Sequence, residues 1–116
     1  MQTQGGVNEM EQSPSPRMAQ LQKMLERTPN DPFLLYGLAL EYKKAGDFPT
    51  ALQYLRKTTE IDAGYCYAYF QRGQVYEAMG DVPSARQAYL EGIDAAAKKG
   101  DQHARSELEG ALGMIE

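Results

Sequence analysis

The sequence predicts an all-α protein, an antiparallel helix-hairpin solenoid of about two and a half repeats followed by a C-terminal capping helix. Residues 45–55 (AGDFPTALQYL) and 79–89 (MGDVPSARQAY) start 34 positions apart and share Gly, Asp, Pro, Ala and Gln in register. A fixed period of this length indicates one supersecondary unit that stacks on its copies. The chain has 116 residues, of which 42% are hydrophobic and 24% charged, so it suits a single soluble domain rather than a disordered segment.

The repetition extends beyond these two stretches to the whole of segments 32–65 and 66–99. Several further positions carry related residues, such as Phe33/Tyr67 and Tyr36/Phe70. The identical pairs are Tyr42/Tyr76, Gly46/Gly80, Asp47/Asp81, Pro49/Pro83, Ala51/Ala85, Gln53/Gln87 and Ala63/Ala97.

The shared Gly-Asp-x-Pro motif predicts a tight turn between two helices. Gly46 and Gly80 suit the left-handed position just past a helix C-terminus, where a Cβ would be unfavourable. The following aspartates are expected to cap the next helix, and the prolines fit its first turn, where a missing N–H is harmless. The chain therefore makes the same helical hairpin twice.

The helices on both sides of each turn show helical periodicity of apolar residues. Small residues at Ala51 and Ala85 are expected where two helices approach closely. The predicted buried positions are Leu35, Leu38, Ala39 and Tyr42; Tyr69, Arg72 (a charged exception), Gly73 and Tyr76; Ala51, Leu55 and Thr58; and Ala85, Tyr89, Gly92 and Ile93.

These motifs resemble the tetratricopeptide repeat (TPR) family, with Ala63 and Ala97 where the family usually has proline. The resemblance implies a TPR-like superhelix over residues 16–116, preceded by a flexible tail at 1–15. Its parts are a half repeat at 16–31, repeats at 32–65 and 66–99, and a capping helix within 100–116. In the half repeat Ser15 caps the helix and Leu21, Met24 and Leu25 occupy core positions. In the capping helix Asp101 is the cap, and the apolar face is Ala104, Leu108, Ala111, Leu112 and Ile115.

The resemblance also implies a concave groove, lined by the first helix of each repeat, that binds a peptide or helix of a partner protein. Four aromatics on this surface would serve as apolar anchors, with lysine and arginine beside them for acidic flanking residues. The candidate groove residues are Phe33, Tyr36, Leu40, Lys43, Lys44, Tyr67, Phe70, Gln71, Gln74 and Arg105; the family positions also include Gly37, Glu77, Ala78, Asp101 and Ala104.

Two alternatives leave this surface occupied by the protein itself. The closing helix could fold over the aromatics through Leu108 and Leu112, or a homodimer could bury them, since large exposed apolar patches are rare in monomers. The family's carboxylate clamp for chaperone C-termini is not expected, because its positions hold Tyr36, Leu40, Gln71, Asp101 and Arg105, of which only Arg105 fits.

Other functional classes find little support. The formal charge of −4 disfavours nucleic-acid binding. Cys66 and His103 fall near the starts of neighbouring helices, but a Cys–His pair without an orienting group is weak evidence for a nucleophile. No spacing of possible ligand residues suggests a metal site or a cofactor site. We therefore expect no catalytic residues, and we expect that the protein is not an enzyme. The sequence shows neither a secretory signal nor a membrane span, and a cytoplasmic protein is expected.

Overall fold

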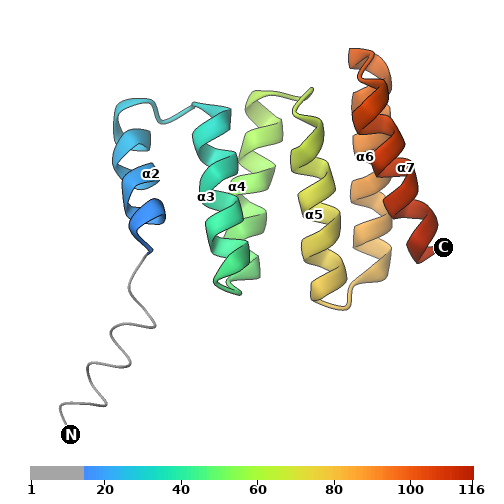
Figure 1. Ribbon diagram of the computed structural model, residues 1–116, viewed down its shortest axis with the longest axis horizontal. Coiled ribbons are helices and arrows are strands. Elements are labelled where there is room, and N and C mark those ends of the chain that lie inside the picture. Colours follow the sequence, from blue (N-terminus) through green and yellow to red (C-terminus); the bar gives the residue numbers. More distant parts are fainter. Residues whose placement is uncertain (1–14) are drawn as a thin grey trace, which may run out of the picture.

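The computed structural model describes residues 15–116, and this part of the chain is helical without strands. Most of the expected flexible tail therefore lies outside the described residues. The helices stand side by side in chain order (Figure 1). They are α2 (Pro16–Arg27), α3 (Pro32–Lys44), α4 (Phe48–Ile61), α5 (Cys66–Ala78), α6 (Val82–Lys99) and α7 (Gln102–Ile115). The predicted all-α solenoid is confirmed.

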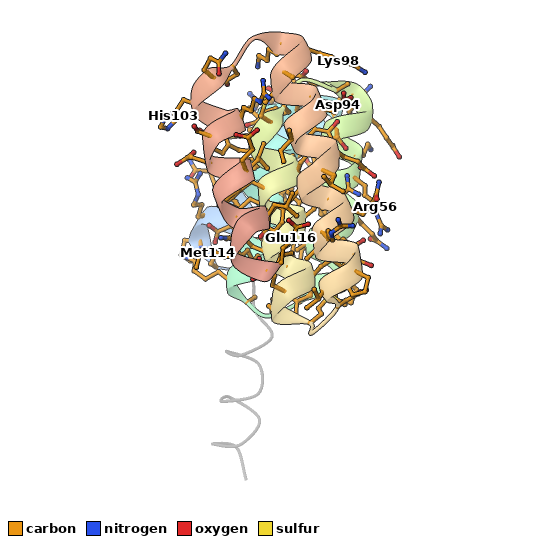
Figure 2. The ribbon with its side chains drawn as sticks, turned by 90° about the vertical axis from the view of Figure 1, so that its right-hand side faces the viewer. Arg56, Asp94, Lys98, His103, Met114 and Glu116 are labelled. Carbon is orange, nitrogen blue, oxygen red and sulfur yellow. The ribbon has the colours of Figure 1, made fainter. Side chains whose placement is uncertain are left out.

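The helices form two rows. The first-helix row holds α3, α5 and α7, and the second-helix row holds α4 and α6. Viewed from the C-terminal end, α7 lies on one side and α6 on the other (Figure 2). The labelled His103 of α7 and Arg56 of α4 mark opposite edges of the molecule in this view.

The turns at 45–48 and 79–82 have the same geometry, as the repeated motif predicts. Gly46 and Gly80 adopt φ values of 84° and 79°. The N–H of Asp47 bonds to the Tyr42 carbonyl at 2.9 Å, and the N–H of Asp81 to the Tyr76 carbonyl at 2.8 Å. These bonds satisfy carbonyls that a helix end would otherwise leave unpaired.

The predicted N-caps are also confirmed. A side-chain oxygen of Ser15, Asp47, Asp81 and Asp101 accepts the N–H of Met18, Thr50, Ser84 and Ala104, respectively.

The core consists of two apolar clusters. Cluster A includes Ala39, Leu55, Val75, Tyr89 and Leu108 and runs from α3 to α7. Cluster B, between α2 and α3, contains Met18, Leu21, Leu34 and Leu38. The partly buried Tyr54 packs against both. Ala51 and Ala85 are fully buried, which confirms the expected close helix contacts.

Met24 and Ala97 do not occupy the positions expected of them. Met24 was expected in the core but is 46% exposed, and Met18 is buried instead. Among the described residues α2 packs on α3 alone, so only one side of α2 is covered. The identity of Ala63 and Ala97 does not reflect equivalent positions, because Ala63 follows α4 whereas Ala97 lies inside α6. Alanine favours helix, and α6 continues to Gly100, which is left-handed with a φ of 78°.

Candidate functional site

The first helices share a connected polar and aromatic surface, which we call the first-helix face. It comprises Phe33, Tyr36, Leu40 and Lys43 of α3; Tyr67, Phe70, Gln71 and Gln74 of α5; and Glu107 of α7. Side chains of neighbouring helices contact one another across this face, so the three helices present one surface rather than three separate ones.

Lys43 joins α3 to α5. Its ammonium donates to the Gln71 Oε1 at 2.6 Å and to the Gln74 Oε1 at 3.0 Å. The side chain is partly buried, and the loss of solvent lowers the pKa of Lys43. Among residues 15–116 no carboxylate forms an ion pair with it.

Two pairs of aromatic rings involve residues of this face, and Gln71 bonds to both Tyr36 and Lys43. The ring centroids of Tyr36 and Tyr65 are 5.0 Å apart, and those of Tyr67 and Phe70 are 6.4 Å apart in an edge-on arrangement. Burial raises the pKa of Tyr36, and the side-chain hydrogen bond with Gln71 partly opposes this shift. Phe33, near the N-terminus of α3, is 64% exposed and is the most open aromatic of the face.

Tyr67 connects α5 to α7. Its hydroxyl donates to the Glu107 Oε1 at 2.7 Å. This bond to a carboxylate, with a smaller contribution from lost solvent, raises the pKa of Tyr67 to about 12. The same Glu107 oxygen lies 3.6 Å from the His103 Nε2. Glu107 was not among the expected site residues, because in the sequence it looks like an ordinary solvated helix charge.

The predicted site residues do not all lie together. Gly37 is buried rather than open, because an added Cβ would stand 3.3 Å from the Leu21 Cδ1 on α2. Lys44 is exposed at the end of α3. Arg105 pairs with Glu109 of its own helix at 3.1 Å.

Leu108 of α7 is almost completely buried, with its methyl carbons close to Gly92 of α6. The helix packs on α6 and, less extensively, on α5, without approaching the backbone of α3. In the alternative where Leu108 and Leu112 cover the four aromatics, α7 would therefore reach only those of α5, where Tyr67 contacts it, and not those of α3.

Cys66 has the environment of a packing residue. Its Sγ donates to the Gly64 carbonyl at 3.3 Å, and burial raises the pKa of the thiol. His103 is exposed and directed to Glu107. A catalytic cysteine requires the opposite shift, toward the thiolate. Between residues 15 and 116, no three metal-ligating side chains cluster, and no helix is long and apolar enough to cross a membrane.

Comparison with known proteins identifies the family. The family model for the tetratricopeptide repeat matches residues 67–99. The TPR repeat-containing protein PA0015 of Pseudomonas aeruginosa is 35% identical over 88 residues, which cover 76% of this chain and 84% of that protein. The chain belongs to the tetratricopeptide repeat family.

Two solved structures are similar in fold. The solution structure of a tetratricopeptide repeat domain protein from Salinibacter ruber is 34% identical, with a TM-score of 0.71 over 76% of this chain and 89% of that one. The crystal structure of PcrH in complex with the chaperone binding region of PopD has a TM-score of 0.77 at 16% identity, covering 84% of this chain and 74% of that one. The tetratricopeptide fold supports a protein–protein interaction module.

Proposed function

We propose that this chain is a non-enzymatic module that binds a peptide or helix of a partner protein across the first-helix face. The observation that carries the proposal is the continuity of this face from α3 to α5, because the partly buried Lys43 bonds to side chains of α5 and aromatic side chains lie on both helices. Aromatic side chains bury large areas at little entropic cost and often dominate binding energy. The PcrH complex supports the proposal in a general way, because it shows a protein of this fold with a bound segment of another protein.

The competing hypothesis is a homo-oligomer in which a second copy occupies the same face. The exposure of Phe33 suits both occupants. Light scattering across a dilution series separates them, because only self-association gives a mass that depends on concentration.

The proposal is tested by affinity capture from a lysate of the source organism with the Phe33→Glu variant as bait. An acidic residue in the first turn of α3 is compatible with the helix dipole, so the variant is expected to fold. Leu90→Glu is the matched control: Leu90 is 39% exposed on α6, in the second-helix row.

We expect the wild type and Leu90→Glu to retain the same partner and Phe33→Glu to lose it. Reconstitution with the purified partner must then reproduce this difference. If both variants retain the partner equally well, binding does not use the first-helix face and the proposal is wrong.

A further inference from the structure

Resting on the proposed function, we infer that the partner segment carries two recognition groups: a carboxylate that binds the Lys43 ammonium, and a large apolar side chain that packs on Phe33. The protein would thus select acidic-apolar segments in which these groups lie about 15 Å apart, the rise of ten helical residues along α3.

The Lys43 ammonium has an incomplete set of hydrogen-bond partners within residues 15–116. An ammonium has three donors, and the two glutamine oxygens accept two of them. Among residues 15–116 the other partly buried cation is Arg72, and it pairs with the carboxylate of Glu91. Lys43 instead has two neutral acceptors, which fix the ammonium without neutralising its charge.

A simpler explanation would be that Lys43 only stabilises the C-terminal end of α3, as cations at that end generally do. The geometry differs from that role, because both hydrogen bonds lead away from α3 to the side chains of α5. Lys44 also lies in the last turn and remains exposed. The helix end therefore already has a solvated cation, and Lys43 is free to act across the face.

The energetic balance favours a carboxylate as the ligand. Partial burial has removed water from the Lys43 ammonium, which lowers its pKa. A carboxylate arriving at this position would restore the lost stabilisation by a charge-assisted hydrogen bond. The charge of the site is thus complementary to an acidic side chain.

The second recognition group follows from the spacing along α3. Phe33, Tyr36, Leu40 and Lys43 recur at intervals of three or four residues, so they share one side of the helix. Phe33 stands at the open N-terminal end of this stripe and Lys43 at the other. In an extended ligand, a rise of about 3.3 Å per residue places the acidic and apolar residues roughly four or five positions apart.

The test uses a displayed library of random peptides, with full-length wild type, Lys43→Met, Lys44→Met and Phe33→Glu as baits. The two lysine variants remove the same charge from neighbouring positions of one helix. We expect the wild type and Lys44→Met to enrich peptides with Asp or Glu four or five positions from a large apolar residue. Lys43→Met is expected to lose the acidic preference and keep the apolar one.

A selected peptide is then synthesised with its acidic residue as Glu and as Gln. The Glu form is expected to bind the wild type about tenfold more tightly, a difference typical of a partly desolvated charge pair. With Lys43→Met the two forms are expected to bind equally.

The failures are distinguishable. Peptides that bind without acidic preference, or whose preference survives Lys43→Met, overturn the inference and leave the proposed function standing. If no selected peptide binds the wild type more tightly than Phe33→Glu, the proposed function is overturned as well. The chain itself carries Glu9 and Glu11 ahead of the described residues. If an acidic preference emerges only with a full-length Glu9→Gln/Glu11→Gln bait, the chain supplies the carboxylate that binds Lys43. That result would overturn the inference that a partner supplies it.

Discussion

The ring of Tyr89 on α6 occupies the space that a side chain at Gly73 of α5 would need: a Cβ added to Gly73 would lie 2.2 Å from the Tyr89 Cε1. Tyr89 is fully buried, and its hydroxyl donates to the carboxylate of Glu77 one turn beyond Gly73 on α5. The ring can therefore pack against the α5 backbone only because position 73 has no side chain. The pairing fixes how closely the two helices of the second hairpin approach.

Gly73→Ala is therefore expected to destabilise the protein by about 1–3 kcal/mol, although alanine is the better helix former. Gly110→Ala is the matched control, since this position lies in α7 with nothing within 4 Å of the added carbon. That variant is expected to stabilise the protein by about 0.5–1 kcal/mol. Urea denaturation measures both, and effects of the same sign would contradict the structure.

The buried alanines of the second helices give a second prediction. Ala51→Glu or Ala85→Glu would place an unpaired carboxylate in a fully buried position, at a cost of more than about 3 kcal/mol. The helical signal in circular dichroism should be lost or melt at a much lower temperature. Gln53→Glu, an exposed position of α4, should change the stability by less than about 0.5 kcal/mol. A folded and equally stable Ala51→Glu variant would refute the helix register.

Arg72 gives a third prediction, because it occupies a position where the repeat pattern expects an apolar residue. Its guanidinium lies 5.8 Å from the centroid of the Tyr69 ring and 3.4 Å from Glu91, while its buried Nε has no hydrogen-bond partner within residues 15–116. Arg72→Met should leave the free energy of unfolding unchanged or raise it by up to about 2 kcal/mol.

Glu91→Ala removes only the acidic partner of Arg72 and is the control. It should lower the stability, since the largely buried cation remains. Thermal and urea denaturation of both variants would show the order. If Arg72→Met were the less stable of the two, the guanidinium would be a net stabilising element of the hairpin.

Tyr67 gives a prediction about pH. The hydrogen bond to Glu107 raises the pKa of Tyr67 to about 12 from its ordinary value of 10.0. The folded state keeps the phenol proton where the unfolded state loses it, so the contribution to stability is complete below pH 10 and lost as the pH rises toward 12.

The ¹³Cζ resonance of Tyr67 in NMR spectra would follow this titration directly. In Glu107→Gln the acceptor loses its charge, and the pKa of Tyr67 should fall toward its ordinary value. An unchanged titration in that variant would mean that the bond between α5 and α7 does not form in solution.

Much of the fold could be predicted because its signals are local. A glycine followed by aspartate and proline specifies a turn and a cap through its own backbone, so Gly46 and Asp47 adopt the expected geometry. Identity at a repeat position is a weaker guide, as Ala97 shows. Alanine does not end a helix as proline would, and α6 extends through this position.

The site depends on contacts between helices, which the repeat pattern does not encode. Gly37 was expected on the open face, but it is buried because Leu21 of α2 packs against α3 at this position. The bonds of Lys43 to Gln71 and Gln74 similarly require a particular separation and rotation of α3 and α5. The repeat positions of the groove residues therefore do not predict which of their side chains contact one another.

The division of the core into clusters A and B has a consequence for local opening of the native state. Cluster B ties α2 to one side of α3, and within residues 15–116 the side chain of Tyr54 packs against both clusters. α2 can therefore detach without exposing the apolar side chains between α5, α6 and α7, so its free energy of opening is well below that of global unfolding. Amide hydrogens of α2 should exchange with solvent ahead of those of α5 and α6, and Tyr54→Ala should increase this difference by uncoupling the two ends of the molecule.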